Sequence, residues 1–241
     1  EEYPDLEVDA YLNALDTMAL EVEERLPSTR YPMKILHTIN GYLFEDLGYS
    51  GNRTEYYDPA NSFLNQVIDR RTGIPITLSL VYLAIARRVG FPMIGINMPG
   101  HFIIRPVVEE MEVFVDPFHQ GEILFLQDCE NLLEKVFDRR VEVRPEYLAP
   151  VANRQFLGRL LTNLKVIYVN QQEFQKALDA LDRILLLFPN MAIEVRDRGV
   201  LNYRLNRNND ARKDFEHYLA IAPMAEDAQL IRGILEELPD D

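Results

Sequence analysis

One stretch of the chain, from Pro75 to Gly90, is apolar on almost every face. Pro75 suits the first position of a helix, where a missing N–H loses no hydrogen bond, and Gly90 suits the left-handed residue after the last turn. A helix without a polar face lies inside a core or a membrane, and this run is shorter than the roughly 18 to 20 apolar residues that span a bilayer. The pattern therefore predicts a buried core helix.

Three further helices are predicted before this core helix. Apolar positions recur with the 3.6-residue period of an amphipathic helix over 5–26, and a second helical pattern covers 33–47. The polar segment 58–62 then provides a start for a helix over 63–70. We expect these helices to cover one side of the core helix.

After the core helix the pattern changes to short runs of β-branched and aromatic residues. These runs predict an antiparallel meander, with a turn at Pro99 and Gly100 and a charged turn at 109–112. An edge strand at 121–124, a helix over 126–137 and a last strand at 141–143 are predicted to follow. The expected fold class is α+β, with helices packed on one antiparallel sheet.

From about residue 152 the chain is helical and repetitive. Three pairs of similar positions, Ala177 and Ala211, Leu181 and Phe215, and Pro189 and Pro223, are each separated by 34 residues, the period of a tetratricopeptide repeat. Two repeats and a capping helix over 226–238 are predicted. Roughly three repeats are usually needed for independent stability, so we expect the repeats to pack on the core. The predicted divisions are N-terminal helices 1–60, a core 61–150 and repeats 151–241.

The charge balance argues against nucleic acid as a partner. The chain has 25 basic and 39 acidic residues, a net charge of −14, and its basic residues come in pairs among carboxylates. Cys129 is the only cysteine, so no intrachain disulfide forms and a reducing compartment is compatible. No secretory or membrane-spanning segment is visible, and we expect a cytoplasmic protein without a membrane partner.

Two polar residues after the core helix carry the candidate chemistry. His101 opens one predicted strand, and Asp116 ends another. A helix start, then a histidine, then an aspartate is the chain order of papain-like and transglutaminase-like thiol enzymes. With the segments 58–64, 70–76, 99–102 and 116–118, this stretch resembles the transglutaminase-like core. Together with the repeats, the chain resembles bacterial SirB-type proteins.

The resemblance implies a catalytic cysteine at the start of the core helix, which this chain lacks. A Gly-x-Cys pattern falls on Gly73, Ile74 and Pro75. Proline has neither a thiol nor an N–H to help hold an oxyanion, so two components of thiol catalysis are missing. His101 and Asp116 then remain as a vestigial dyad. The pocket implied beside them contains Asn61, Ser62, Arg71, Gly73 and Gly100.

Simpler roles stay open for several of these residues. Asn61 and Ser62 also suit helix caps, and Asp116 before a proline also suits a turn. His101, in the absence of a thiol, also suits a structural position in an apolar strand. Arg71 is either a solvated charge or the partner of a buried acid near the helix start.

The sequence also contains other candidate nucleophiles and a candidate metal site. Ser79 and Thr77 lie near the helix start, although Ser79 is a full turn beyond Pro75. Cys129 is a poor nucleophile, because neighbouring acids raise a thiol pKa. His101, Asp116 and His119 have the composition of a two-histidine, one-carboxylate metal site, a combination that often arises by chance. We expect neither a metal nor a cofactor.

The expected function is that of a transglutaminase-like pseudoenzyme module whose repeats bind a protein or peptide. The alternative is an acyl-transfer or amide-hydrolase activity that uses Ser79, Thr77 or a water activated by His101.

Overall fold

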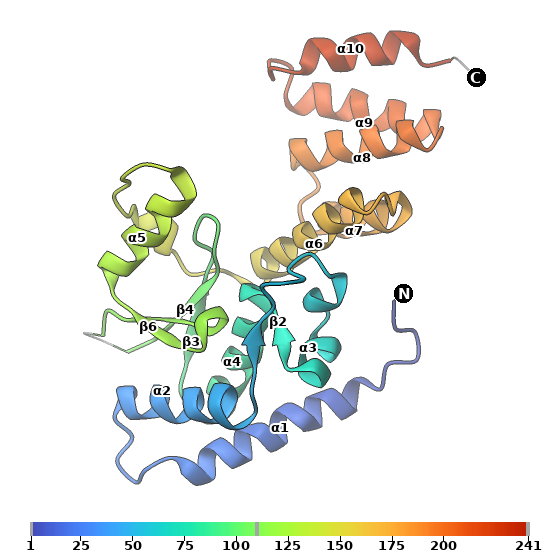
Figure 1. Ribbon diagram of the computed structural model, residues 1–241. Helices are drawn as coiled ribbons and strands as arrows, with labels where there is room; N and C mark the ends of the chain where they lie inside the picture. Colours follow the sequence, from blue (N-terminus) through green and yellow to red (C-terminus); the bar gives the residue numbers. More distant parts are fainter. Residues whose placement is uncertain (1, 109–110, 240–241) are drawn as a thin grey trace. The chain divides into compact units, whose positions relative to one another are not determined.

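The computed structural model of the protein describes residues 2–108 and 111–239. The chain divides into two compact units, the first ending at Phe156 and the second beginning at Leu157. Helices, one small antiparallel sheet and a short pair of parallel strands make up the first unit, and the second is helical (Figure 1). The predicted α+β class is confirmed. Within the described ranges, no helix is long and apolar enough to cross a membrane.

Helix α4 (Pro75–Arg88) is the core helix of the first unit. It contacts α1 (Val8–Arg25), α2 (Pro32–Asn40) and α3 (Leu64–Arg70), and also strands of the sheet. Most of its side chains are buried, and Gly90 after its end has φ +71°. The core-helix prediction is therefore confirmed, because a helix covered on several sides needs no polar face.

The predicted helix over 33–47 has two parts. An α-helical part, α2, ends at Asn40, and a π-helical segment, η1 (Gly41–Asp46), continues it. Three consecutive side chains of η1, Tyr42, Leu43 and Phe44, are buried. The wider turn of a π-helix brings consecutive side chains closer to one face, which explains how all three reach the core.

The sheet is the predicted meander. Strands β3 (Met93–Ile96), β4 (Ile103–Pro106), β5 (Phe114–Asp116) and β6 (Glu122–Leu124) lie in that order, each antiparallel to its neighbour. Helix α5 (Leu126–Phe137) follows within its predicted range. Two residues of the predicted charged turn, 109 and 110, lie outside the described residues.

The predicted last strand at 141–143 is wrong. Val141 and Val143 are partly buried against the cluster that contains Leu133, and they pair with no strand among the described residues. The β-like contact is made further along, where Pro150 bridges to Ile96 and the N–H of Val151 donates to the carbonyl of Gly95. The two valines therefore serve packing, which produces the same apolar alternation as a strand.

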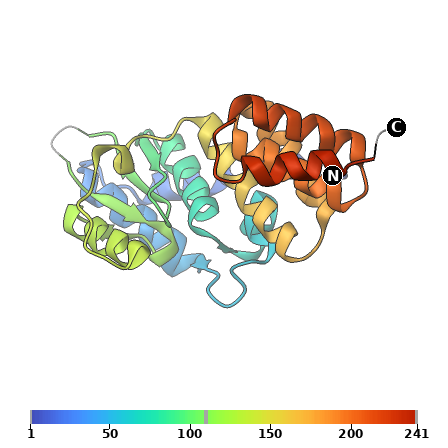
Figure 2. The same cartoon turned by 90° about the horizontal axis from the view of Figure 1, so that it is seen from above.

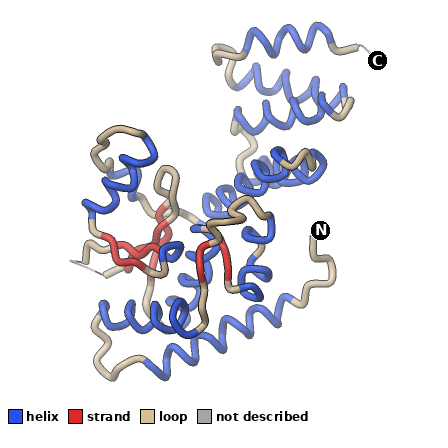
Figure 3. The backbone as a smooth tube through the Cα atoms, viewed as in Figure 1, coloured by secondary structure: helices blue, strands red, loops and turns tan. Residues whose placement is uncertain are grey.

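A short parallel pair was not predicted. Strand β1 (Ser50–Gly51) pairs with β2 (Thr72–Gly73), which leads directly into α4. Figure 3 shows this pair apart from the meander. The 3-10 helix η2 (Pro59–Ser62) lies between β1 and β2 in the sequence. It is capped by the Asp58 side chain, which accepts a hydrogen bond from the N–H of Ala60.

The second unit has the paired helices of tetratricopeptide repeats. Its helices are α6 (Asn153–Asn170), within which the unit boundary falls, α7 (Phe174–Leu187), α8 (Ala192–Arg204), α9 (Asn208–Ile221) and the capping helix α10 (Ala228–Glu237). Helix α9 packs between α8 and α10 (Figure 1), and Figure 2 shows the repeat helices from above. A Cβ at Gly199 would lie 2.8 Å from the Phe215 ring, so this close approach of α8 and α9 requires glycine.

Candidate functional site

Asp116 is held rigidly at the end of β5. It is 1% exposed, and its Oδ1 accepts hydrogen bonds from the N–H groups of Phe118 at 3.0 Å and His119 at 3.3 Å. These bonds cap η3 (Pro117–His119), so the turn-forming role considered from the sequence is present. They also fix the carboxylate plane, which leaves Oδ2 for other partners.

His101 reaches Asp116 from the loop before β4. Gly100 has φ +73°, and a Cβ at that position would lie 2.5 Å from Cγ2 of Val136 on α5. Glycine is therefore required where the loop turns toward the site. Nε2 of His101 lies 2.6 Å from Oδ2 of Asp116. The structure thus brings the two residues of the predicted dyad together, and their vestigial catalytic role stays a prediction.

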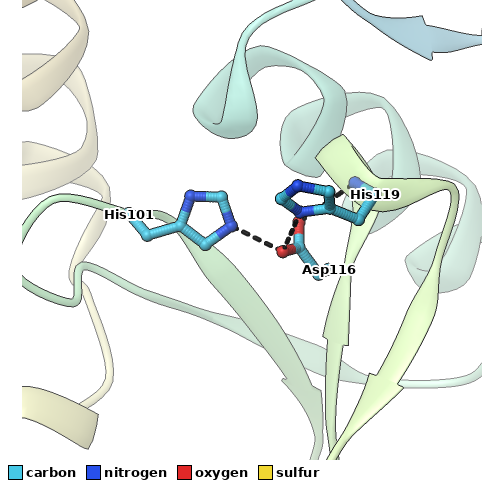
Figure 4. Close-up of side chains that lie close together, drawn as sticks. All are labelled: His101, Asp116 and His119. Atoms are coloured by element: carbon cyan, nitrogen blue, oxygen red, sulfur yellow. Dashed lines mark hydrogen bonds and ion pairs between the residues drawn. The ribbon is translucent and has the colours of Figure 1, made fainter. Parts of the chain in front are cut away.

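His119 is a third member of the cluster. Its Nδ1 lies 2.7 Å from the same Oδ2 atom, so two imidazole rings converge on one carboxylate oxygen (Figure 4). The predicted dyad did not include His119, which entered only in the metal alternative. The signal in the sequence is that His119 lies three residues after Asp116, with a proline between them. A single 3-10 turn brings residues three apart onto one side.

The electrostatics favour an ionised Asp116. Burial alone would raise the pKa of this carboxyl, but the hydrogen bonds and charges of His101 and His119 outweigh it and hold the pKa below its ordinary value. An ionised carboxylate only accepts hydrogen bonds, so each imidazole directs an N–H at Oδ2. In the neutral rings, Nδ1 of His101 and Nε2 of His119 then carry lone pairs.

Contacts connect η3 to the segment that enters α4. A Cβ at Gly51 in β1 would lie 2.6 Å from the Phe118 ring, and Gly51 pairs with Gly73 in β2. Helix α4 itself also contacts η3. Pro75 begins α4 and is buried there.

The remaining predicted pocket residues make structural contacts. Buried Asn61 donates to the carbonyls of Glu55 at 2.7 Å and Tyr56 at 3.2 Å, which holds the loop before η2 rather than capping α3. Ser62 is buried, and its Oγ has no hydrogen-bond partner among the described residues. Arg71 is exposed and donates to the carbonyl of Leu47 at 2.8 Å rather than to a buried acid.

Gly73 allows the start of α4 to close tightly. A Cβ at this position would lie 2.8 Å from Oγ1 of Thr77. That hydroxyl donates to the carbonyl of Asn61 at 2.8 Å and accepts from the N–H of Ile74 at 3.1 Å. Thr77 and Ser79 are both fully buried. The two hydroxyls considered as nucleophiles therefore lie inside the core.

Cys129 is a buried residue of α5. Its side chain belongs to the core cluster with Ile103 and Leu133 and is 0% exposed. Burial, with added repulsion from the charges of Asp128 and Asp116, raises the pKa of the thiol to about 12. A thiol in this state is protonated at neutral pH, so it is a poor nucleophile.

Two of the hollows formed by the described residues are lined entirely by residues outside the His101 cluster. One of about 370 Å³ lies on the repeats and is lined by Lys165, Val166, Val169, Asn170, Leu181, Asp197, Val200, Leu201 and Arg204. The other, of about 940 Å³, lies beside α5 and is lined by charged side chains of both signs. None of the predicted site residues lines either hollow.

Comparisons with known proteins agree with this architecture. The transglutaminase-like superfamily matches residues 9–162, and a tetratricopeptide-repeat family matches residues 164–236. A UPF0162 protein of Xylella fastidiosa strain 9a5c is 38% identical over 252 residues, covering 100% of this chain and 87% of the relative. A UPF0162 protein of Vibrio cholerae is 29% identical over 199 residues, covering 82% of this chain and 73% of the relative.

A further relative is matched over a smaller share of both chains. Human F-box only protein 21 is 32% identical over 168 residues, which is 65% of this chain and 26% of the relative. No solved structure matches the chain. The superfamily match spans well over half of the sequence, and the order of helix, histidine and aspartate fits it. The chain therefore belongs to the transglutaminase-like superfamily, with tetratricopeptide repeats following the transglutaminase-like domain.

Proposed function

We propose that this protein is a SirB-type binding module, in which the transglutaminase-like domain has lost thiol catalysis and the repeats bind an extended peptide. The observation that carries the proposal is the state of the only thiol in the chain. Cys129 is fully buried in α5, and its pKa is raised to about 12. We place the nucleophile position of the transglutaminase-like pattern at Pro75, which has no thiol.

The hydroxyl alternative has less support. Acyl transfer needs a nucleophile that reaches its substrate, with a base within hydrogen-bond distance. Thr77 uses its hydroxyl to join Ile74 and Asn61 at the helix start, and Ser79 is fully buried. A water activated by His101 remains the enzymatic alternative, because His101 is oriented by an ionised carboxylate as a general base would be.

The hollow on the repeats supports the peptide-binding part of the proposal. It combines apolar surface from Val166 and Val200 with the amide of Asn170 and the guanidinium of Arg204. Apolar surface with a few polar groups is typical of ligand sites, in which the polar groups fix the orientation of the ligand. The amide and the guanidinium can donate hydrogen bonds to peptide carbonyls, and the apolar surface can pack against apolar side chains of a peptide.

Covalent trapping tests the loss of catalysis. The full chain is incubated with broad serine-, threonine- and cysteine-directed electrophiles, and the labelled sites are mapped by mass spectrometry. We expect no labelling of Ser79, Thr77 or Cys129 in the native protein, because all three are buried. Native labelling that disappears in Ser79→Ala or Thr77→Val would establish a hydroxyl nucleophile and contradict the proposal.

Selection from a displayed random-peptide library tests the repeats. Peptides selected on the full chain should bind Val166→Glu at least about tenfold more weakly, since a carboxylate in the hollow disfavours burial of apolar side chains. Leu186→Glu is the matched control. Leu186 is 81% exposed on α7 and does not line the hollow, whereas Val166 is 42% exposed and does. Equal affinity for both variants, or failure to select any peptide, would exclude the hollow on the repeats as a peptide-binding site.

A further inference from the structure

Three potential metal-ligand atoms are gathered at one point in the first unit. One potential ligand atom from each of His101, Asp116 and His119 lies within 4.8 Å of the other two (Figure 4). Among the described residues, this group meets the requirement of three or more histidine, cysteine or acidic side chains close enough to hold a metal ion. Two imidazoles and one carboxylate suit first-row divalent metals, including Zn²⁺ and Fe²⁺.

The separations are close to those of a metal site. Oδ2 of Asp116 lies 2.6 Å from Nε2 of His101 and 2.7 Å from Nδ1 of His119. Ligands about 2.0 to 2.1 Å from a tetrahedral Zn²⁺ lie about 3.3 Å apart. The two rings would therefore move outward by about 0.6 to 0.7 Å, a shift within reach of small side-chain rotations. His119 is 34% exposed, which leaves it room for such a movement.

The backbone already orients the carboxylate as a metal ligand needs. Metal-binding carboxylates are themselves held by hydrogen bonds, and Oδ1 of Asp116 accepts two from Phe118 and His119. The fixed Oδ2 then faces both rings. Since one side of the cluster is partly exposed, a bound ion would keep a position for water or another ligand, as catalytic rather than structural zinc sites do.

Metal binding would replace two hydrogen bonds with two coordinate bonds. In the ion-free cluster, each ring directs an N–H at Asp116. Coordination needs the lone pair on that same nitrogen, so the ring proton moves to Nδ1 of His101 or Nε2 of His119. A neutral ring therefore changes tautomer without losing a proton, whereas a protonated ring releases one proton to solvent. The net charge of −14 on the whole chain further favours the approach of a cation.

We propose that His101, Asp116 and His119 form a binding site for one divalent transition-metal ion. From the sequence alone we expect no metal, so this proposal differs from that expectation. It does not depend on peptide binding by the repeats. The competing interpretation is a hydrogen-bonded cluster with no affinity for metal ions.

The test is a Zn²⁺ titration of the full chain after treatment with a chelator, followed by calorimetry and by native mass spectrometry. We expect one Zn²⁺ per chain, with a dissociation constant of about 1 µM or lower, and at least about 100-fold weaker binding by His101→Gln and by His119→Gln. Co²⁺ in place of Zn²⁺ should give a visible absorption band typical of four or five ligands, and His119→Gln should abolish it.

The other two histidines of the chain provide the controls. His37 and His217 are exposed, and His37→Gln and His217→Gln make the same chemical change outside the cluster. Both should bind Zn²⁺ as the wild type does. Circular dichroism establishes that each variant is folded. Absence of stoichiometric binding to the wild type, or equal affinity in the cluster variants and the controls, would overturn the proposal and leave a hydrogen-bonded cluster only.

Discussion

At the scale of single residues, surroundings decide chemistry more than residue type does. A cysteine, a threonine and a serine are candidate nucleophiles, yet each is buried in the core. Asp116 is also buried, but it is ionised because two imidazoles and two backbone N–H groups surround it. Within the His101 cluster, the imidazoles of His101 and His119 are partly exposed, so they are the groups that can meet a ligand.

Cys129 should resist alkylation in the native protein. At pH 8, a thiol with a pKa of about 12 is ionised in about one molecule in ten thousand, and burial further prevents contact with the reagent. Iodoacetamide should modify the chain at a rate set by unfolding. In guanidinium chloride the same residue should react as an ordinary thiol. Rapid labelling of the native chain without loss of circular dichroism signal would show that α5 opens readily.

Pro75→Cys tests whether the start of α4 retains the environment of a thiol enzyme. A thiolate there would be stabilised by the helix N-terminus, and by His101 if the thiol-enzyme arrangement is retained, so the new thiol should then react faster than Cys129 and below pH 8. Stability should fall only by about 0.4 to 1 kcal/mol, the usual effect of proline on the unfolded chain. The alkylation rate is measured against pH in chelator-treated protein. A thiol pKa at or above the ordinary value would show that His101 and Asp116 do not activate this position.

At the scale of elements, a buried ion pair joins the first helices of the two repeats. Lys165 on α6 donates to Glu194 at 2.6 Å and to Asp197 at 3.0 Å on α8, and Lys165 and Glu194 are almost fully buried. Burial alone would lower the pKa of Lys165, but the two carboxylates outweigh it and raise the pKa above 10.5. The lysine therefore stays charged in the folded repeats.

Lys165→Met should destabilise the protein by about 3 to 5 kcal/mol, because it leaves the Glu194 charge buried without a partner. Urea unfolding midpoints measure the loss. The raised pKa means that the contribution of Lys165 is fully present below pH 10.5 and is lost as pH rises through the folded-state value. Lys213→Met, in an exposed pair with Asp210, is the control and should change stability by less than about 0.5 kcal/mol. A similar effect of both variants would rule out a special role for the buried pair.

Elements with a strong local pattern were predicted well from the sequence. Helix α4, the meander and the 34-residue repeat all have periodic apolar positions, and each was found. The β1 and β2 pair was missed because two residues carry no period and because its partners lie 22 positions apart, from Ser50 to Thr72. Likewise, the order of residues indicated His101 and Asp116, whereas the position of His119 depended on a 3-10 turn after Pro117.

At the scale of the whole molecule, the two units differ in how they are built. The first unit has a central helix covered by other helices and a sheet, whereas the second is a short array in which each helix packs mainly on its neighbours. Such an array has stability close to the sum of its repeats and their interfaces. Two repeats and a cap supply few of these interfaces.

The segment 151–241 should accordingly be poorly folded when expressed alone. At its start, the Phe156 ring loses its edge contact with Phe102, whose ring centroid is 5.2 Å away in the first unit. Thermal unfolding followed by circular dichroism provides the measurement, with the full chain as reference. A cooperative transition at a temperature close to that of the full chain would show that the repeats are stable by themselves.

The hydrogen bond between Asn40 and Gly121 has a consequence for the order in which parts of the first unit fold. The Asn40 side chain at the end of α2 donates to the Gly121 carbonyl at 2.7 Å, across 81 positions of sequence, just beyond the turn that carries Asp116 and His119. Closing so long a loop costs chain entropy before the contact is formed, while α4 needs only local hydrogen bonds.

We predict that pulsed hydrogen exchange during refolding will protect the amides of α4 before those of Phe118 and His119. Earlier protection of these two amides would contradict the prediction. The His101 cluster would then be among the last parts of the first unit to form, so a newly synthesised chain would acquire its core well before its candidate site.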